Sequence, residues 1–482
     1  MSRECLMNKQ RKHDIGYVIR ICMITALGGL LFGYDTAVIS GAVSPLQDYF
    51  SLSPTMTGWA VSNVVIGCII GSMFAGRISM AIGRKKALML SALLFFISAL
   101  GSALAASFTA FVVFRMIGGL AVGLASVVSP MYMSEVTPKD YRGRTVSMHQ
   151  QSVVIGQLVV FYVNYLIAKG MSEAWLAELG WRYMLGSEII PALLLGSLLF
   201  LIPESPRWCV LKNRDEDAHK TLSRISNPNH AERLIAEIKA SLEEHHDKGK
   251  VSLFSPGLRA IVIIGCLIAS MQQVIGINVI MYYSPDILKP LAGSTESAML
   301  QTTLIGVVFV AGNAIGMYLI DKLGRVPLLK IGSVGCGIGL ALASWGIYTE
   351  SAGYTALIGL ILYVIAFAIS WGCCCWTLIS EIFPNRIRSR AMALAVACQW
   401  ASGFVVTQTF PMLSKNAWLN ENFNGAFSFW LYACMTLVAL WFVIRYVPET
   451  KGVSLEKMEQ HFQSQLSKKE RASVIPDPTM TI

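Results

Sequence analysis

The feature that most constrains this chain is a series of apolar runs, each about 20 residues long, that recur along almost its whole length. A helix of that length crosses a hydrocarbon core of roughly 30 Å. Helices also satisfy their own backbone hydrogen bonds, which lipid cannot do. The pattern therefore predicts an all-α membrane protein with twelve transmembrane helices. The predicted spans are residues 18–41, 57–80, 87–106, 108–132, 146–168, 183–202, 258–285, 298–320, 328–348, 354–378, 391–411 and 425–447.

Composition and charge agree with a membrane location. Only 14% of the 482 residues are charged, whereas a soluble domain carries roughly 25%. The net charge of +10 would suit nucleic acid, but the basic residues gather at the termini and in alternate short loops. That distribution is the positive-inside pattern. We therefore expect no nucleic-acid partner, a multi-pass protein of the plasma membrane (the bacterial inner membrane), and both termini and segment 206–257 in the cytoplasm.

Nothing in the sequence indicates an enzyme or a metal site. Most of the eleven cysteines lie inside apolar runs, and none has the spacing of metal ligands. Two groups of glycines, in 118–123 and 332–339, also lie inside apolar runs without a preceding strand. They indicate close helix packing rather than a nucleotide-binding loop. We expect no cofactor and no catalytic residue.

The chain repeats itself with an offset of about 245 residues. The Glu, Pro and Arg spacing of 135–144 recurs at 381–390, and the Pro-Glu-Ser of 203–205 answers the Pro-Glu-Thr of 448–450. Two similar halves are typical of transporters that work by alternating access. Between them, two amphipathic stretches predict short cytoplasmic helices. The predicted divisions are a tail at 1–17, a six-helix half at 18–205, a helical linker at 206–257, a second six-helix half at 258–447 and a tail at 448–482.

Several motifs together resemble the sugar porter family of the major facilitator superfamily. They are LGGLLFGYDTAVISG (27–41), R-x-x-G-G-x-x-V-G (115–123), PESPRW (203–208), QQVIGIN (272–278), SEIFPNRIRSR (380–390) and VPETKG (447–452). The likeness runs from about residue 18 to 455. It implies the major facilitator fold, two pseudo-symmetric lobes of helices with a monosaccharide held between them.

Asp35 is the first candidate for proton coupling. An ionisable side chain inside a membrane span is costly, so it is expected to face the bundle interior and to have a partner. Arg115, in the fourth span, is the predicted partner. A movement that separates the two would let the desolvated carboxyl group take a proton; the alternative is a static structural ion pair. The resemblance implies a supporting role for Glu188, whereas His149 is expected to be structural.

A sugar site needs neutral hydrogen-bonding groups for hydroxyls and aromatic faces for C–H surfaces. Gln150 and Gln157 lie seven residues apart, on one helix face. Gly276 can break the seventh span and expose its backbone to a cavity. Each glutamine alone could merely bridge two helices. Jointly with the resemblance, the predicted substrate-binding residues are Phe32, Gln150, Gln157, Gln272, Gln273, Asn278, Tyr282, Gly372, Trp376, Gln399 and Trp400.

A third group of charged residues occupies the cytoplasmic loops of both halves. Opposite charges repeated at matching positions could lock the two lobes together on the inside. The alternative is that they only set topology, because isolated exposed ion pairs contribute about 0–1 kcal/mol. The predicted cytoplasmic gate consists of Arg84, Glu135, Arg142, Asp321, Arg325, Glu381 and Arg388.

Three positions depart from the family pattern. Phe309 stands where relatives carry a sugar-binding Asn, and Asn313, one turn later, could substitute from the same face. Cys373 stands where Pro is usual, which could alter how the tenth span bends. Met80 and Ala81 stand where an Asp-Arg pair is usual, which would weaken the gate of the first half.

The sequence thus predicts a proton-coupled symporter that imports a monosaccharide, a pentose such as xylose first, by alternating access. The proton is the coupling ion, the lipid bilayer is the surroundings, and a monomer is expected to suffice. An uncoupled sugar uniporter is the first alternative, and retention of Asp35 argues against it. A membrane sugar sensor that binds without transport is the second, and the short C-terminal tail argues against that.

Overall fold

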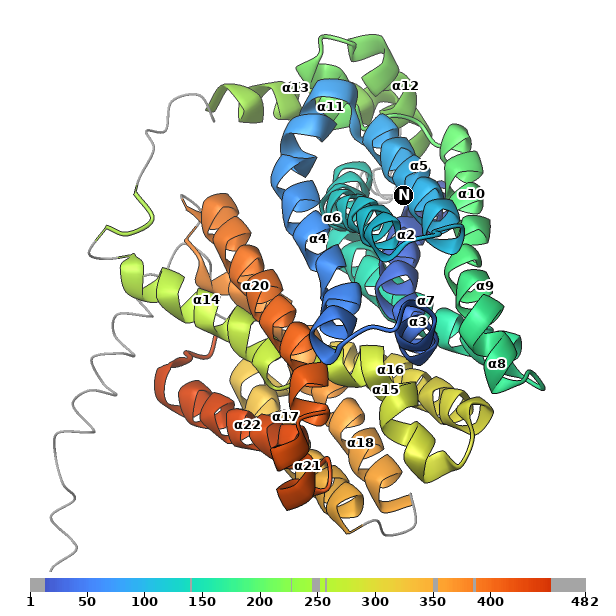
Figure 1. The fold of residues 1–482 in the computed structure, drawn as a ribbon. Coiled ribbons are helices and arrows are strands. Elements are labelled where there is room, and N and C mark those ends of the chain that lie inside the picture. The colour runs from blue at the N-terminus through green and yellow to red at the C-terminus, as the bar shows by residue number, and fades with distance from the viewer. Residues whose placement is uncertain are drawn as a thin grey trace, which may run out of the picture. The chain divides into compact units, whose positions relative to one another are not determined.

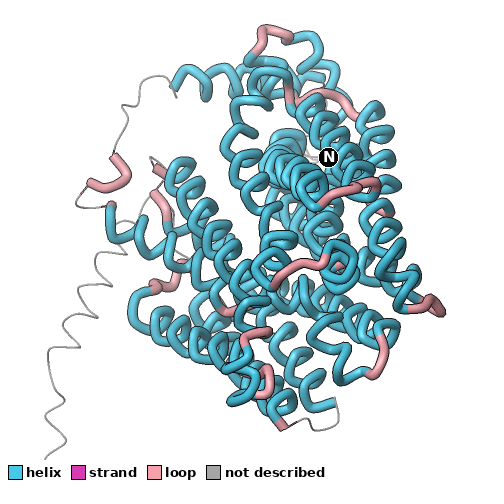
Figure 2. The backbone as a smooth tube through the Cα atoms, viewed as in Figure 1, coloured by secondary structure: helices cyan, strands magenta, loops and turns pink. Residues whose placement is uncertain are grey.

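The structure is a computed structural model that describes residues 14–138, 141–226, 228–244, 252–255, 258–349, 354–384 and 387–451. Every regular element in these ranges is helical (Figure 2). Within them, 12 helical segments are long and apolar enough to cross a membrane. The predicted all-α fold with twelve membrane spans is therefore confirmed.

The chain divides by its internal contacts into two compact units. The first comprises Met1–Leu52 and Ala60–Lys250, and the second comprises Ser53–Trp59 and Val251–Ile482. The helices of the linker therefore pack with the first unit, whereas the division predicted from the sequence treated residues 206–257 as a separate segment. Figure 1 draws the first unit mainly from blue to green and the second from yellow-green to red.

In the first unit, α2 packs against α6 and α7, and α5 packs against α6 and α10. The sixth span is interrupted: α9 ends before Ser187 and Glu188, and α10 begins directly after them. The elements before the linker are α2 (Ile15–Val38), η1 (Ile39–Gly41), α3 (Val43–Phe50), α4 (Pro54–Ile82), α5 (Arg84–Ala103), α6 (Phe108–Val136), α7 (Arg142–Ala168), α8 (Glu173–Trp175), η3 (Leu176–Gly180), α9 (Trp181–Gly186), α10 (Ile189–Leu198) and η4 (Leu199–Leu201).

The linker forms three short helices, α11 (Pro206–Leu211), α12 (Asp215–Ile225) and α13 (Pro228–Glu244). The two amphipathic stretches of the sequence correspond to α12 and α13, as predicted. Their apolar faces meet in a small core around Trp208 and Cys209, against which Ile235 and Ile238 of α13 pack. The linker is therefore a folded cap on the first unit (Figure 1).

In the second unit, α17 packs against α18 and α22, and α14 packs against α20. Two of its spans are irregular: the seventh is split into α14 and α15, and the tenth contains the π-helical turn η5. The elements are α14 (Arg259–Val274), α15 (Ile277–Ala292), α16 (Thr295–Leu323), α17 (Arg325–Tyr348), α18 (Tyr354–Phe367), η5 (Ala368–Gly372), α19 (Cys373–Ile382), α20 (Arg388–Ser414), α21 (Ala417–Phe423) and α22 (Phe427–Tyr446).

The two glycine groups lie at helix contacts. A methyl group on Gly119 of α6 would lie 2.1 Å from the carbonyl oxygen of Val64 on α4. One on Gly339 of α17 would lie 2.5 Å from the main-chain nitrogen of Tyr363 on α18. Only glycine permits backbones to approach so closely. The prediction that these glycines serve helix packing is confirmed for Gly119 and Gly339, whereas nothing lies within 4 Å of a methyl group at Gly337.

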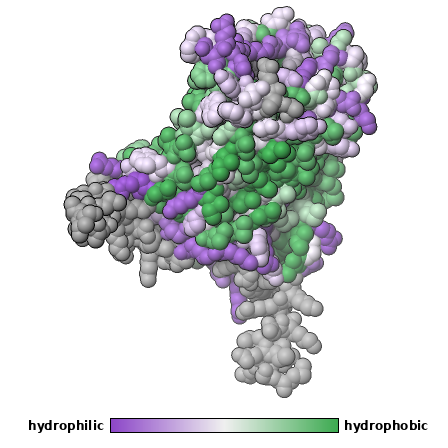
Figure 3. All heavy atoms as spheres, turned by 90° about the horizontal axis from the view of Figure 1, so that it is seen from below, coloured by the Kyte–Doolittle hydropathy of each residue, from purple (hydrophilic) through white to green (hydrophobic). Residues whose placement is uncertain are grey.

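Large apolar side chains remain exposed on the outside of the helices. Ile190, Phe200 and Met73 are 74%, 73% and 70% exposed, which would be costly in water but not in lipid. Figure 3 shows such side chains gathered over a broad area of one face, with hydrophilic residues beyond it. The exposed surface is thus that of a protein solvated by a bilayer.

Candidate functional site

A buried ion pair lies inside the first unit. Asp35 comes from α2 and Arg115 from α6, and their side chains are 0% and 1% exposed. Nη1 of Arg115 donates to Oδ1 of Asp35 at 2.8 Å, and Nη2 donates to the main-chain oxygen of Asp35 at 3.1 Å. The predicted partner of Asp35 is confirmed. Removing one member of such a buried pair costs about 3–5 kcal/mol, because the other charge is left without a partner.

Glu188 brings a second carboxyl group to the same place. It lies between α9 and α10, is buried, and is close enough to the Asp35 carboxyl group for the two acids to interact electrostatically. Neither Oδ2 of Asp35 nor Oε1 of Glu188 has a donor among the described residues. Two carboxylates beside one guanidinium leave one unbalanced negative charge, and neighbouring carboxylates resist double ionisation. This arrangement is suited to holding one proton.

The break that carries Glu188 is tied to α2. The hydroxyl groups of Tyr34 and Ser187 are hydrogen-bonded at 2.7 Å, and these residues directly precede Asp35 and Glu188 in the sequence. The two carboxyl-bearing segments are therefore held together by a contact that does not involve the carboxyl groups. Changes in their charge can occur without separating the backbone segments.

The second unit contains a connected cluster of amides. Gln272 and Gln273 lie near the end of α14, Asn278 lies near the start of α15, and Gln399 lies on α20. The Asn278 amide donates to Oε1 of Gln273 at 2.7 Å, and the Gln273 amide donates to Oε1 of Gln272 at 3.4 Å. Gln399 donates to that same Gln272 oxygen. The structure thus brings together four of the predicted substrate-binding residues, the amide cluster.

The amide cluster is placed by the break in the seventh span. Gly276 adopts φ +96°, a left-handed conformation that glycine tolerates, and the helix stops and restarts there. The freed carbonyl oxygen of Ile275 accepts a hydrogen bond from the Tyr363 hydroxyl at 3.0 Å. The predicted break at Gly276 is confirmed. In a continuous helix, Asn278 would lie five residues beyond Gln273 along the axis. With the helix interrupted at Gly276, the two side chains meet and form a hydrogen bond.

The other predicted substrate-binding residues of the second unit lie on α15, η5, α19 and α20. Gly372 ends the π-helical turn η5, next to Trp371, whose main-chain oxygen accepts from the Gln272 amide at 3.0 Å. Trp376 on α19 and Trp400 on α20 are half-buried. Tyr282 on α15 is buried.

Three predicted substrate-binding residues belong to the first unit. Phe32 on α2, and Gln150 and Gln157 on α7, are half-buried. A methyl group on Gly33 would lie 1.8 Å from the carbonyl oxygen of Val153 on α7, so α2 and α7 are in close backbone contact beside Phe32. Oε1 of Gln157 is buried without a donor in the described part of the chain.

A first charge cluster consists of Arg84, Glu135, Glu204 and Ser205. Arg84 grips Glu135 with two hydrogen bonds of 3.0 and 2.9 Å, and the Ser205 hydroxyl donates to the same carboxylate. Glu204 accepts from the main-chain N–H groups of Arg84 and Lys85 at 2.9 and 3.1 Å. An acidic group at a helix N-terminus is favourable because it satisfies free N–H groups and meets the positive end of the helix dipole.

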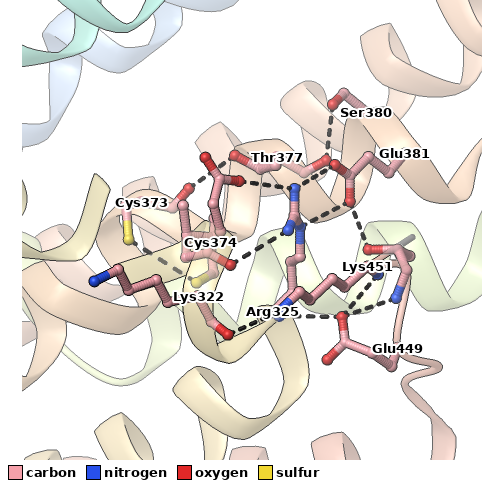
Figure 4. Close-up of polar contacts among 12 residues, drawn as sticks. Lys322, Arg325, Cys373, Cys374, Thr377, Ser380, Glu381, Glu449 and Lys451 are labelled. Carbon is pink, nitrogen blue, oxygen red and sulfur yellow. Dashed lines mark hydrogen bonds and ion pairs between the residues drawn. The ribbon is translucent and has the colours of Figure 1, made fainter. Parts of the chain in front are cut away.

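A second charge cluster, Arg325, Glu381, Glu449 and Thr450, repeats the first (Figure 4). Arg325 grips Glu381 with hydrogen bonds of 3.1 and 2.8 Å, and the Thr450 hydroxyl donates to Glu381 at 2.5 Å. Glu449 accepts from the main-chain N–H groups of Arg325 and Val326 at 3.1 and 2.9 Å. Each cluster fastens the start of one membrane helix to a glutamate on another helix and to the segment after the last span of its unit.

The model of the family described as "Sugar (and other) transporter" matches residues 21–462. The chain belongs to this sugar transporter family. It is 41% identical to the D-xylose-proton symporter of Escherichia coli, over 97% of this chain and 100% of that one. It is 38% identical to the arabinose-proton symporter of Bacillus subtilis, over 93% and 96%.

A solved structure supports the same assignment. The inward-open conformation of the xylose transporter XylE from E. coli matches with a TM-score of 0.82 and 41% identity, over 92% of this chain and 99% of that one. The resemblance inferred from the motifs is confirmed, and so is the major facilitator fold. This sugar transporter is a membrane carrier and not an enzyme, as its sequence predicted.

The predicted gate of this sugar transporter is only partly described. Its ion pairs Arg84–Glu135 and Arg325–Glu381 each lie within one unit. Asp321 contributes a longer contact of 3.7 Å to Arg325 from a largely exposed position, and Arg388 donates to the carbonyl oxygen of Phe383. The side chain of Arg142 lies outside the described residues. These contacts are ties inside each unit, and their action as a gate between lobes stays a prediction.

The structure shows what surrounds the residues that depart from the family pattern. Phe309 is buried with its ring 6.3 Å from that of Phe367, and Asn313 is buried one turn later on α16. Cys373 directly follows the π-helical turn, and its thiol donates to the carbonyl oxygen of Ile369 at 3.0 Å. A π-turn therefore interrupts the helix just before the position where proline was expected. The main-chain oxygen of Met80 accepts from the Trp208 indole at 2.9 Å.

Two functional features escaped the sequence reasoning. The sequence analysis does not assign capping roles to Glu204 and Glu449, although both belong to a repeated Pro-Glu-Ser/Thr motif. The sequence does contain a signal for these caps. In both halves, about 245 residues apart, a glutamate recurs together with the Gly-Arg pair at which the capped helix begins. The approach of Glu188 to Asp35 was also not predicted, because it depends on the packing of α10 against α2.

Proposed function

We propose that this chain imports a pentose, D-xylose first, together with a proton by alternating access. The observation that carries the proposal is the buried group of Asp35, Glu188 and Arg115, in which two acids share one base. A structural ion pair would need only one acid. A group that binds and releases a proton needs an acid whose charge the neighbouring base does not already balance. The second carboxyl group provides this, because Arg115 balances only one carboxylate.

The proton would act through the Asp35–Arg115 contact. With a proton on the carboxyl pair, the negative charge that holds Arg115 falls, and the guanidinium can move away from α2. With the proton released, the carboxylate again attracts Arg115 across 2.8 Å. Protonation therefore favours one arrangement of α2 and α6, and deprotonation favours another. No cofactor is proposed, and the proton is the coupling ion.

The sugar would be recognised by the amide cluster of the second unit. A pentose presents hydroxyl groups that both donate and accept, and amides offer both functions. Oε1 of Gln399 is buried without a donor in the described ranges, so it can accept from a sugar hydroxyl. Trp376 and Trp400, on the neighbouring helices α19 and α20, would present aromatic faces to the sugar's C–H groups.

Energetically, one proton per sugar is sufficient for useful accumulation. A proton that crosses 100 mV supplies about 2.3 kcal/mol. Because 1.4 kcal/mol corresponds to a factor of ten, this supports roughly 40-fold accumulation of the sugar. The positive-inside distribution of Lys and Arg supports an orientation with both termini in the cytoplasm, and we propose that one copy is sufficient for transport.

Reconstitution in liposomes tests the proposal. Labelled xylose uptake would be followed with and without an imposed inward proton gradient, with other pentoses and hexoses as competitors. We expect uphill uptake that requires the gradient in the wild type. Asp35→Asn should lose accumulation but retain exchange of labelled for unlabelled xylose. Asp48→Asn, an exposed aspartate on α3, should behave as the wild type.

Two outcomes would contradict the proposal. Equilibration of xylose that ignores the gradient in the wild type would indicate a uniporter and leave Asp35 with a structural role. Binding of xylose without any flux would indicate a sensor.

A further inference from the structure

Ser98 on α5 lies next to the proposed proton site without a hydrogen bond of its own. Its side chain is buried, and its hydroxyl group has no partner among the described residues. Serines inside helices commonly return the hydroxyl to a carbonyl of the preceding turn, as Ser91 of the same helix does with Leu88 at 2.8 Å. A buried hydroxyl group that does not do so calls for an explanation.

The position of Gly118 on α6 shows what Ser98 faces. A methyl group at Gly118 would lie 2.5 Å from Oγ of Ser98 and 2.9 Å from Oδ1 of Asp35. The hydroxyl and the carboxylate therefore border the same small space, which exists because the residue is glycine. Gly118 follows Arg115 by three residues, so this space lies on the helix face that carries the guanidinium group.

The titratable groups around Asp35 come from the other helices. Arg115 lies on α6, Glu188 precedes α10, and the thiol of Cys68 on α4 is close enough to interact electrostatically with Asp35 and Arg115. On α7, His149 lies against Gly29, six residues before Asp35. The contribution of α5 is an uncharged hydroxyl, which can donate to a carboxylate without changing the charge of the site.

We propose that Ser98 is a positioning residue of the proton site, whose hydroxyl donates to the Asp35 carboxylate as the proton leaves and before Arg115 returns. A buried carboxylate without its guanidinium partner needs another donor. Rotation about the Cα–Cβ bond of Ser98 changes the direction of its hydroxyl without moving α5. The hydrogen bond stabilises the ionised carboxylate and so sets the pH at which the site takes up its proton. This inference rests on the proposed function of Asp35 in proton coupling.

The test is the pH dependence of gradient-driven xylose uptake into liposomes. Ser98→Ala removes the donor, so the carboxyl group should hold its proton to higher pH. The midpoint of the decline in uptake at alkaline pH should move up by about one pH unit. Ser98→Thr keeps the hydroxyl and should restore the wild-type midpoint. Ser98→Cys, a weaker donor of similar size, should give an intermediate midpoint.

Ser102→Ala is the matched control, because Ser102 is on the same helix and its hydroxyl group is likewise buried without a partner among the described residues. Its midpoint should equal that of the wild type. An unshifted midpoint in Ser98→Ala and Ser98→Cys, or an equal shift in Ser102→Ala, would overturn the role of Ser98 alone. Wild-type uptake that ignores the proton gradient would instead overturn the proposed function on which it rests.

Discussion

At the scale of single residues, the main feature is the balance of charge among the buried side chains around Asp35. Asp35 and Glu188 together carry one more potential negative charge than Arg115 balances. In lipid-embedded protein, that excess is too costly to leave uncompensated, so a proton is the natural counter-charge. The buried group of Asp35, Glu188 and Arg115 is therefore balanced in charge only when it binds a proton, the ion that the protein is proposed to carry.

The need for a counter-charge also explains which residues the sequence could predict. An isolated acid in an apolar run demands a base in another run, which identified Arg115 for Asp35. Glutamines in spans are ambiguous one by one, and family resemblance was needed to single out Gln272, Gln273 and Gln399. The approach of Glu188 could not be predicted, because it depends on how α10 packs against α2.

At this scale we predict that Gln272 dominates sugar binding within the amide cluster. Gln272→Ala removes the oxygen that accepts from both Gln273 and Gln399 and leaves two buried donors unpaired. Xylose affinity should fall roughly ten- to hundredfold, as measured by isothermal titration calorimetry in detergent. Asn422→Ala, on the exposed side of α21, is the control and should bind xylose with unchanged affinity. Equal affinities for all three proteins would contradict a role of the amide cluster in binding.

At the scale of secondary-structure elements, the functional side chains gather at interruptions. Glu188 lies in the break of the sixth span, Asn278 follows the break of the seventh, and Gly372 ends the π-turn of the tenth. Helical periodicity predicts the spans but assumes that each is continuous. Only Gly276 signalled an interruption in the sequence, because glycine alone tolerates the left-handed conformation at low cost.

We predict that the break at Gly276 is required for stability. Gly276→Ala would force a side chain into φ +96° and place its methyl group 2.8 Å from the ring of Tyr432. Backbone strain of this kind costs on the order of 1–3 kcal/mol, so the melting temperature in detergent should fall. Gly337→Ala on α17 is the matched control, because nothing lies within 4 Å of its added methyl group. Its melting temperature should stay the same or rise slightly, and a fall equal to that of Gly276→Ala would refute the argument.

At the scale of the whole molecule, the two units carry different parts of the chemistry on one repeated scaffold. The charge clusters of the two units match residue by residue, from Arg84 and Arg325 to Glu204 and Glu449. By contrast, the carboxyl pair occurs in the first unit and the amide cluster in the second. The repeat predicted the shared scaffold from sequence alone. The difference between the two units, a carboxyl pair in one and an amide cluster in the other, comes from residues that the repeat does not share. The repeat alone therefore could not predict it.

The central claim is that sugar entry carries a proton through the Asp35 site. The most direct measurement uses liposomes that enclose a pH-sensitive dye, without any imposed gradient, to which xylose is added outside. The account predicts internal acidification by the wild type at roughly one proton per sugar, with Asp35→Asn admitting labelled xylose but causing no acidification. Xylose entry into wild-type liposomes without acidification, or equal acidification by Asp35→Asn, would contradict it.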